Sequence, residues 1–273
     1  MKKLRPSVII TTYQRPQALA LVLQGLAAQT EPPFEVIVAE DGQDAETAAL
    51  IQRLSADLPY PLLHVVHEDL GFRAAKIRNK AVAKANGDYL IFLDGDCIPR
   101  PTFIKHHLNL AEEGWFVSGN RVLLNQGFTQ QVEKEQLPIY QWSLYHWVIA
   151  YVRGYCNRWL TLCYLPFFKL FNKNKSKSWK GAITCNLAIW KKDFIMVNGF
   201  DEAFEGWGYE DTDLVIRLFN LGCRRIKGYF SIAVIHLWHR QSERSQAQSH
   251  LQRVMERQKN NMIMVEKGVD QYL

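Results

Sequence analysis

Two aspartates separated by one glycine follow a strongly apolar stretch of the chain. Asp94, Gly95 and Asp96 come directly after residues 89–93, a pattern typical of a buried strand. Two carboxylates in one cleft would repel each other unless a cation or donor hydrogens compensate. A divalent ion that bridges carboxylate and diphosphate oxygens would remove that repulsion. An ordinary Asp-Gly turn is the alternative, because so short a motif often occurs by chance.

A second acidic group lies among glycines and aromatic residues. Residues 206–214 read GWGYEDTDL and include Trp207, Glu210 and Asp211. Asp211 or Thr212 could cap a following helix, since hydroxyl and acidic side chains favour a helix start. Capping does not require the glycine-flanked Trp207, whose ring is suited to pack against the C–H face of a sugar.

Histidines and basic residues could complete such a site. His236 and His239 follow a strand-like run, and either imidazole could join an Asp/His metal site, with His236 favoured. Lys76 and Arg78 lie near the start of an expected helix, where cations could meet phosphate oxygens or form a solvated face. The Gly-Lys-Ser/Thr of a P-loop does not occur beside them.

Alternating strand and helix patterns would position these groups. We expect strands at 7–12, 35–39, 62–67 and 89–93 and helices at 16–29, 45–55 and 74–85. Repeated βα units with little polar alternation predict a right-handed, parallel, Rossmann-like sheet covered on both faces. Ligands bind beyond the carboxyl ends of such strands, so one cleft could hold residues 11–15, 41 and 94–96.

The remaining elements are a helix at 211–221, a strand at 229–235 and an apolar helical stripe in the tail. The stripe, expected to pack back on the domain, consists of Leu251, Val254, Met255, Met262 and Val265.

Length and composition exclude several classes of protein. The chain has 273 residues, 48% apolar and 22% charged, which excludes disordered and collagen-like chains. Charges or prolines interrupt its apolar runs, so we expect neither a transmembrane helix nor a secretion signal. Five cysteines without a CxxC disfavour a disulfide scaffold or zinc knuckle and favour a reducing cytoplasm.

One segment carries the positive charge. Residues 136–192 contain nine Lys or Arg and no Asp or Glu, although the whole chain has a net charge of only +6. Residues 140–171 hold 11 of the 33 aromatic residues. The segment is either a helical pair with an aromatic core or a patch that meets anionic lipid, and we favour the second. The lipid-facing cations would be Arg153, Arg158, Lys169, Lys173, Lys175 and Lys177.

Several motifs, in this order, resemble inverting family 2 glycosyltransferases of the GT-A fold. They read SVIITTYQR at 7–15, AED at 39–41 and AKANGDYLIFLDGD at 83–96. The stretch GFDEAFEGWGYEDTD at 199–213 resembles an acceptor-side motif of chondroitin-polymerase and β-1,4-galactosyltransferase relatives. Covering about residues 5–240, the resemblance implies a mostly parallel, Rossmann-like central sheet flanked by helices, with an aromatic and basic helical insertion.

The resemblance also implies a division of the chain. A glycosyltransferase domain at 1–240 would comprise a nucleotide-binding half at 1–118, the insertion at 136–180 and an acceptor and metal half at 181–240. A C-terminal helix at 241–273 would follow.

On the donor side, the resemblance implies that Thr11, Tyr13 and Asp41 hold uridine. Tyr13 would stack on the base and Asp41 would accept a hydrogen bond from its ring N–H. Asp94 would reach the ribose or the sugar. Further contacts to ribose or diphosphate would come from Arg15, Lys76 and Arg78.

On the metal and acceptor side, Asp96 and His236 would hold Mn²⁺ or Mg²⁺. Glu210 would bind sugar hydroxyls, Trp207 would contact the acceptor, and Asp211 would be the catalytic base. Two positions differ from the relatives: Gly95 replaces a common aspartate, and Tyr209 replaces a glycine and could narrow the sugar pocket.

The implied reaction is metal-dependent inverting transfer from a UDP-sugar to a hydroxyl of a glycan or lipid-linked oligosaccharide. Bacterial surface polysaccharide and lipopolysaccharide core are the expected products. The expected partners are the UDP-sugar, a glycan or glycolipid acceptor and an anionic membrane surface at 140–180, but no nucleic acid. The expected location is the cytoplasm, at the inner face of the plasma membrane where the patch binds lipid.

Two other functions compete with this one. A non-catalytic membrane-surface or glycan-binding protein would leave the Asp and His groups unexplained. A sugar-nucleotide pyrophosphorylase would open with a glycine-rich phosphate loop, which does not follow Ile10.

Overall fold

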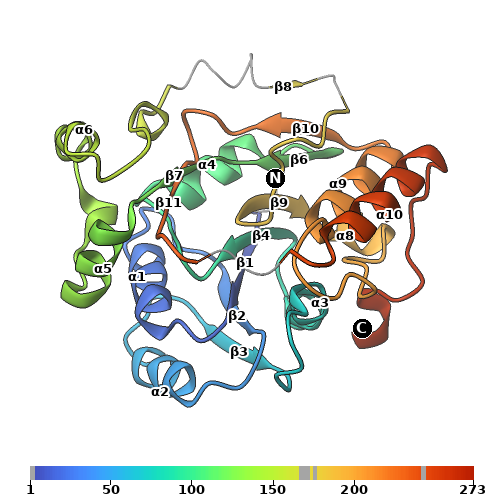
Figure 1. Cartoon of the computed structure of the whole chain (residues 1–273), viewed down its shortest axis with the longest axis horizontal. Helices are drawn as coiled ribbons and strands as arrows, with labels where there is room; N and C mark the ends of the chain where they lie inside the picture. The colour runs from blue at the N-terminus through green and yellow to red at the C-terminus, as the bar shows by residue number, and fades with distance from the viewer. Residues whose placement is uncertain (1–3, 166–172, 175–176, 241–243) are drawn as a thin grey trace.

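A central sheet organises the chain. The computed structural model describes residues 4–165, 173–174, 177–240 and 244–273 (Figure 1). In these residues an eight-stranded sheet has the order β3-β2-β1-β4-β9-β6-β10-β8. In that order its strands are β3 (Leu62–Val66), β2 (Glu35–Glu40), β1 (Pro6–Thr12), β4 (Tyr89–Asp94), β9 (Asn186–Trp190), β6 (Trp115–Ser118), β10 (Arg224–Lys227) and β8 (Lys173–Asn174).

The expected parallel arrangement is confirmed for most of the sheet. Strands β1 to β4 pair in parallel, and β6 pairs in parallel with β10. Strand β9 enters between β4 and β6 and runs antiparallel to both. The sheet is therefore mostly parallel, as in a Rossmann-like fold with one reversed central strand.

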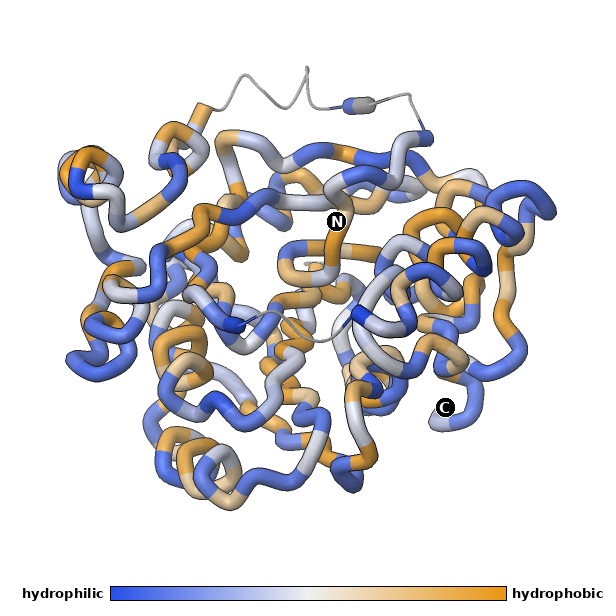
Figure 2. Tube along the Cα trace, viewed as in Figure 1, coloured by the Kyte–Doolittle hydropathy of each residue, from blue (hydrophilic) through white to orange (hydrophobic). Residues whose placement is uncertain are grey.

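Helices cover both faces of the sheet, as the apolar strands predict. Alternate strand residues pack on α1 (Pro16–Ala27) and α2 (Ala45–Leu54) on one face, and on α3 (Ala74–Lys84) and α9 (Glu210–Asn220) on the other. Helix α1 begins at Pro16, whose fixed φ suits a first helical turn. Figure 2 shows hydrophobic residues along the central strands and hydrophilic ones on the outer loops.

A small second sheet brings a histidine to the edge of the first. Its strands have the order β5 (Cys97–Ile98), β11 (Val234–His236) and β7 (Arg121–Leu123). The strand expected at 229–235 begins only at Val234, so the prediction is wrong for its first half. A turn at Gly228, with Phe230 at a φ of 58°, precedes it, and Ile232 is buried without being in a strand.

The aromatic segment, residues 140–171, follows α4 (Phe103–Leu110) and α5 (Gln126–Glu135) in the chain and contains α6 (Leu144–Val152). Short turns η1 (Ile139–Gln141) and η2 (Leu160–Leu162) flank α6. Trp147 is fully buried, and Phe128 of α5 stacks on Tyr155 with a centroid distance of 4.6 Å. Tyr145 and Tyr151 are exposed. Each interpretation of the segment therefore describes some of its aromatic residues.

The tail only partly follows the expected stripe. Helix α8 (Lys191–Met196) precedes α9 in the chain. Helix α10 (Ala247–Lys259) packs on α9, and the short helix η3 (Val269–Tyr272) follows α10 (Figure 1). Val254 and Val265 are buried, whereas Met255 and Met262 are exposed. The helix stops before Met262 because Asn261 adopts a φ of 50°. Within the described residues, no helix is both long and apolar enough to span a membrane.

Candidate active site

The expected residues of the cleft follow neighbouring strand ends. Thr11 of β1 is in register with Asp94 of β4, and Asp41 follows β2. Strand β11 pairs with β5, and the N–H of Leu237 donates to the carbonyl of Asp96 at 3.0 Å. The carboxyl ends of β1, β2 and β4 therefore meet the end of β11, as ligand sites in such sheets require.

Arg78 is the buried cation that joins three parts of this site. Its Nε donates to Thr11 Oγ1 at 2.8 Å, and its Nη1 donates to Glu210 Oε1 at 2.9 Å. Its Nη2 lies 3.4 Å from Asp94 Oδ1. Burial opposes the charge of Arg78, but the carboxylates of Glu210 and Asp94 outweigh that effect and raise its pKa. One guanidinium thus connects α3 with β1, β4 and the start of α9.

Asp211 lies beside this ion pair at the start of α9. Its Oδ1 accepts from the N–H of Thr212 at 2.6 Å. Burial, followed by the negative charge of Glu210, raises the pKa of Asp211 to about 7. A carboxylate with such a pKa can accept a proton near neutral pH, as a general base must.

Asp96 lies close to the imidazoles of both His236 and His239. His236 Nε2 lies 3.7 Å from Asp96 Oδ1, and His239 Nε2 lies 3.6 Å from Asp96 Oδ2. The potential ligand atoms of these three residues lie within 4.8 Å of one another. The sequence favoured His236 over His239, and the structure brings both to the same carboxylate.

The histidine nitrogens are in a state suited to bind a cation. Burial and the nearby Arg121 lower the pKa of His236 to about 4, so its ring is neutral. His239 Nδ1 donates to the carbonyl of Arg240 at 2.9 Å, so Nε2 is the nitrogen that faces Asp96. One carboxylate and two imidazoles form a donor set that fits a divalent transition metal.

Arg15 lies on the metal side of the site. Its Nη1 donates to Asp96 Oδ2 at 2.9 Å, and its Nη2 donates to Glu133 Oε1 at 2.6 Å. Burial raises the pKa of Asp96, so the carboxylate benefits from a cation beside it. The ribose or diphosphate contact expected of Arg15 therefore competes with two carboxylates, and Glu133 of α5 is a member of the site that no sequence motif indicated.

Tyr13 and Asp41 lie together at the other side of the strand ends. The Tyr13 hydroxyl donates to Asp69 at 3.0 Å, and its ring is half exposed. Asp41 contacts His67 Nε2 at 2.6 Å and accepts from the N–H of Arg73 at 2.8 Å. No sequence motif indicated His67 and Asp69, although they follow the end of β3.

Lys76 does not join Arg78. It lines a separate hollow of about 190 Å³ on another side of α3, together with Glu202, Glu205 and Lys267. Residues two positions apart on a helix point in different directions, which separates Lys76 from Arg78. The expected phosphate contact of Lys76 thus has no support from its position.

Trp207 lies in a glycine loop that α10 holds. Arg244 stacks over the Trp207 ring at 4.5 Å, and His250 Nδ1 contacts the carbonyl of Gly208 at 2.9 Å. Tyr209, directly before α9, has a φ of 71°. The left-handed conformation costs a non-glycine residue about 1–2 kcal/mol. The glycine that the resemblance implies for this position would avoid this cost.

The other departure, Gly95, has a steric cause. A Cβ at this position would come within 2.7 Å of Thr12 Oγ1 and 2.8 Å of Thr12 Cβ. The Gly95 N–H also donates to the carbonyl of Thr11 at 2.7 Å, which fixes the close approach. In this chain the turn between the two aspartates therefore has no room for the common aspartate.

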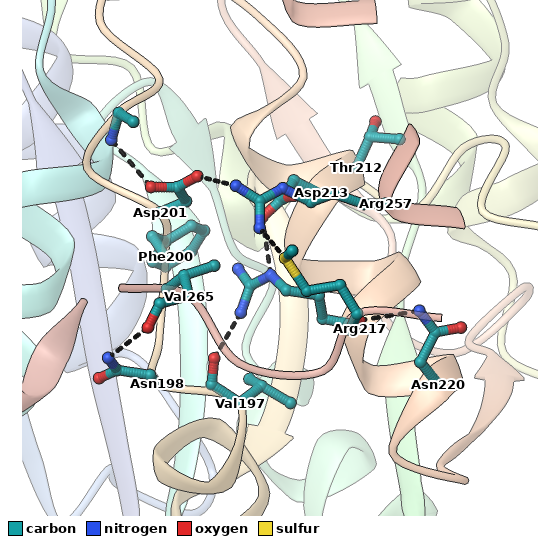
Figure 3. Close-up of polar contacts among 12 residues, drawn as sticks. Val197, Asn198, Phe200, Asp201, Thr212, Asp213, Arg217, Asn220, Arg257 and Val265 are labelled. Atoms are coloured by element: carbon teal, nitrogen blue, oxygen red, sulfur yellow. Dashed lines mark hydrogen bonds and ion pairs between the residues drawn. The ribbon is translucent and has the colours of Figure 1, made fainter. Parts of the chain in front are cut away.

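A buried charge network fixes α9 behind Asp211 (Figure 3). Arg217 Nε donates to Asp213 Oδ2 at 2.8 Å, and Arg257 Nε of α10 lies 2.7 Å from Asp213 Oδ1. Arg257 also pairs with Asp201, and Arg217 Nη1 donates to the carbonyl of Val197 at 2.6 Å. The network ties together α9, α10 and the loop after α8.

Comparisons with known families agree with the geometry. Residues 7–183 match the model described as glycosyl transferase family 2, and residues 166–263 match the one described as the N-terminal domain of galactosyltransferase. The chain belongs to glycosyl transferase family 2.

Three curated family 2 relatives illustrate the similarity. Validoxylamine A glucosyltransferase of Streptomyces hygroscopicus subsp. limoneus is 31% identical over 78% of this chain and 47% of its own length. Chondroitin synthase of Escherichia coli is 26% identical over 81% of this chain and 33% of its own length. Hyaluronan synthase of Pasteurella multocida is 30% identical over 79% of this chain and 23% of its own length. The chain thus spans less than half the length of these relatives.

Solved structures show the same fold at low sequence identity. The mannosyltransferase of Pyrobaculum calidifontis in complex with GDP-Man and Mn²⁺ has a TM-score of 0.63 and 15% identity, over 95% of this chain and 65% of that one. S. aureus TarS 1–349 has a TM-score of 0.62 and 14% identity, over 98% of this chain and 68% of that one. The expected GT-A fold of this family 2 chain is confirmed.

We predict that replacing Arg257 with methionine destabilises the chain by about 3–5 kcal/mol, because it leaves Asp201 and Asp213 partly uncompensated in a buried network. Chemical denaturation measures the change. Lys259→Met, an exposed substitution in the last turn of α10, is the matched control and should change stability by no more than about 0.5 kcal/mol. Equal stabilities of the two variants would contradict the role given to the network.

Proposed function

We propose that this chain transfers a sugar from a UDP-sugar to an acceptor hydroxyl, with inversion and with a divalent metal. The observation that carries the proposal is Asp211, a carboxylate with a pKa of about 7 beside the Glu210–Arg78 ion pair. The Asp96 cation site at the ends of the same central strands adds the second requirement of the reaction. Binding alone would not require a carboxylate poised to titrate near neutral pH.

The donor end of the cleft suits a nucleotide. The half-exposed Tyr13 ring can stack on a base, while His67 and the backbone of Arg73 orient Asp41 beside it. Solved structures with this fold include TarS in complex with UDP and the mannosyltransferase with GDP-Man. We propose UDP for this chain, with Asp41 accepting a hydrogen bond from the ring N–H of uracil.

The residues present fit a divalent cation. Asp96, His236 and His239 would hold it, and two imidazole ligands favour Mn²⁺ over Mg²⁺, which prefers oxygen. When bound, the ion would neutralise the diphosphate charge that develops on departure of the leaving group.

The remaining chemistry belongs to the side chains at the start of α9. Asp211 accepts the proton of the acceptor hydroxyl as its oxygen forms a bond to the anomeric carbon. The bond from that carbon to the diphosphate oxygen breaks on the opposite face, so the configuration inverts. Arg78 holds Glu210 through the 2.9 Å ion pair, which fixes this carboxylate where it can accept hydrogen bonds from sugar hydroxyls.

For the acceptor we propose a glycan or glycolipid of the bacterial surface polysaccharide or lipopolysaccharide core type, reached at an anionic membrane surface. Tyr145 and Val152 of α6 are 71% and 78% exposed, and Arg153 and Arg158 are exposed beside them. Exposed aromatic and basic side chains are the combination that binds headgroups. Such a surface lies at the inner face of the plasma membrane, where UDP-sugars and a reducing cytoplasm meet.

Two of the expected lipid-facing lysines, Lys169 and Lys175, lie outside the described residues. Lys173 is described and pairs with Glu112 at 2.8 Å, so it contributes less to the patch than the sequence suggested.

Replacing Asp211 with asparagine should lower kcat by a factor of about 10²–10⁴ and leave UDP affinity unchanged, because the amide cannot accept the proton. For the unmodified chain, kcat should rise with pH up to about 7 and then level off, since protonated Asp211 is inactive. A UDP-release assay across pH 5.5–8.5 measures the kcat of the variant and the pH dependence of kcat in the unmodified chain. Asp57→Asn, in an exposed turn, is the control. A kcat that does not change below pH 7 would show that another group is the base.

Mn²⁺ with UDP should stabilise the chain by about 2.7 kcal/mol when free ligand is 100 times its Kd. Asp96→Ala, His236→Ala and His239→Ala should each remove the Mn²⁺-dependent part of this gain in a thermal-shift titration. His146→Ala, an exposed histidine outside the site, should keep it. Full retention in Asp96→Ala would place the ion elsewhere.

Vesicles that contain phosphatidylglycerol should float the chain more strongly than phosphatidylcholine vesicles, and added salt should weaken the effect. Val152→Glu should abolish flotation, because it places a negative charge in the exposed patch. Met255→Glu makes the same kind of change on α10, at the other end of the molecule (Figure 1), and should have no effect. Equal flotation of the two variants would exclude α6 as the lipid-binding face.

A further inference from the structure

A cavity of about 350 Å³ lies beneath the aromatic segment, apart from the residues of the active site. Its volume is within the range of sites for small organic ligands. Most of its wall is apolar, and the contributing residues include Phe103, Leu144, Leu162, Ile232 and Ala233. They come from α4, α6, η2 and the turn before β11.

Arg100 brings a positive charge to this apolar wall. Its Nη1 donates to the carbonyl of Leu162 at 2.6 Å, and its Nη2 donates more weakly to the carbonyl of Trp142 at 3.3 Å. Its buried Nε has no hydrogen-bond partner among the described residues. Within the residues that the structure describes, no carboxylate forms an ion pair with Arg100. Carbonyl oxygens satisfy two N–H groups but do not balance the charge.

Partial burial without a counter-ion disfavours the charge of this guanidinium. Burial lowers the pKa of Arg100, which means that its surroundings disfavour the charged form. An arginine nevertheless stays protonated, so an anion beside it would be stabilising. Nη1 and Nη2 each keep a second N–H besides the one on a carbonyl, and these two can donate to a phosphate.

Other polar groups at the cavity are neutral. His106 Nδ1 lies 2.9 Å from the carbonyl of Ser231, and its ring stacks on Tyr164 at 4.0 Å. Burial lowers the pKa of His106, so the stack is uncharged at neutral pH. Thr161 also lines the cavity, but its Oγ1 is buried. The cavity thus combines one cation with a largely apolar wall.

We propose that this cavity binds an anionic phospholipid of the membrane, with its phosphate at Arg100 and an acyl segment against the apolar wall. Charge supports this occupant: residues 136–192, which supply η2, α6 and Tyr164, contain no Asp or Glu to repel a phosphate. Position supports it as well, because Leu144 and Tyr164 line the cavity and are themselves exposed beside the α6 patch. No lining residue belongs to the candidate active site, so the lipid anchors the chain and is not the reacting sugar.

The test uses the full chain and short-chain lipids that stay monomeric, without any donor sugar. Dihexanoyl phosphatidylglycerol should bind in isothermal titration calorimetry, whereas glycerol phosphate, which has no acyl chains, should not. Dihexanoyl phosphatidylcholine, whose headgroup carries no net charge, should bind at least tenfold more weakly. Equal binding of the two lipids would overturn the assignment of an anionic lipid.

Variants locate the binding. Arg100→Met should weaken phosphatidylglycerol binding tenfold or more, whereas Arg53→Met removes an exposed arginine of α2, outside the aromatic segment, and should not. Ser231→Phe keeps Arg100 and fills the cavity, so it should also abolish binding, and it decides the question if Arg100→Met does not fold. Wild-type affinity in a folded Arg100→Met or Ser231→Phe variant would overturn the proposal. Because no sugar transfer is measured, the result is independent of the proposed enzymatic activity.

Discussion

The ion pairs of Arg78 are the interaction on which the site depends. Its contacts with Thr11, Asp94 and Glu210 join positions that are 67, 16 and 132 residues away from it in the sequence. Without a cation at this point, the carboxylates of β4 and α9 would face each other in a poorly solvated cleft, where like charges repel strongly. The chain can therefore place Asp94, Glu210 and Asp211 together only because a fixed guanidinium neutralises part of their charge.

The acidic groups are not fully balanced by arginines, and burial raises the pKa of three of them, Asp94, Asp96 and Asp211. Arg78 lies with Glu210 and Asp94, and Arg15 lies with Asp96, but Asp211 has no guanidinium of its own at hydrogen-bond distance among the described residues. Burial raises the pKa of Asp211 to about 7. Burial also raises the pKa of Asp96 despite Arg15, which is consistent with a carboxylate that gains from further positive charge. Asp211 is the proposed base and Asp96 the proposed metal ligand.

Local patterns predicted what local physics decides. The βα units up to Asp96 were predicted within one or two residues at most ends, because apolar runs and helix starts are properties of neighbouring residues. The insertion of β9 between β4 and β6 could not be predicted, since NLAIW carries no signal of its partners or direction. The contacts of Asp41 with His67 and of Asp213 with Arg257 were missed for the same reason. Lys76 and Arg78 looked equivalent in the sequence, and only their helix geometry separates them.

Two places in the structure hold charges that lack a full counter-charge, and their signs are opposite. The charge is negative at the active-site carboxylates and positive at Arg100 beneath the aromatic segment. Burial raises the pKa of Asp96 after β4 and of Asp211 in α9, whereas Arg100 beneath α6 is a half-buried cation for which the described chain supplies no carboxylate. A chain that needed only stability would gain by placing neutral groups at either position, because a buried unbalanced charge costs several kcal/mol. The proposed partners have the opposite charge in each case: a divalent cation at Asp96 and a lipid phosphate at Arg100. Because these two partners differ in sign and in position, an anionic surface at the aromatic segment would not compete with the proposed cation site.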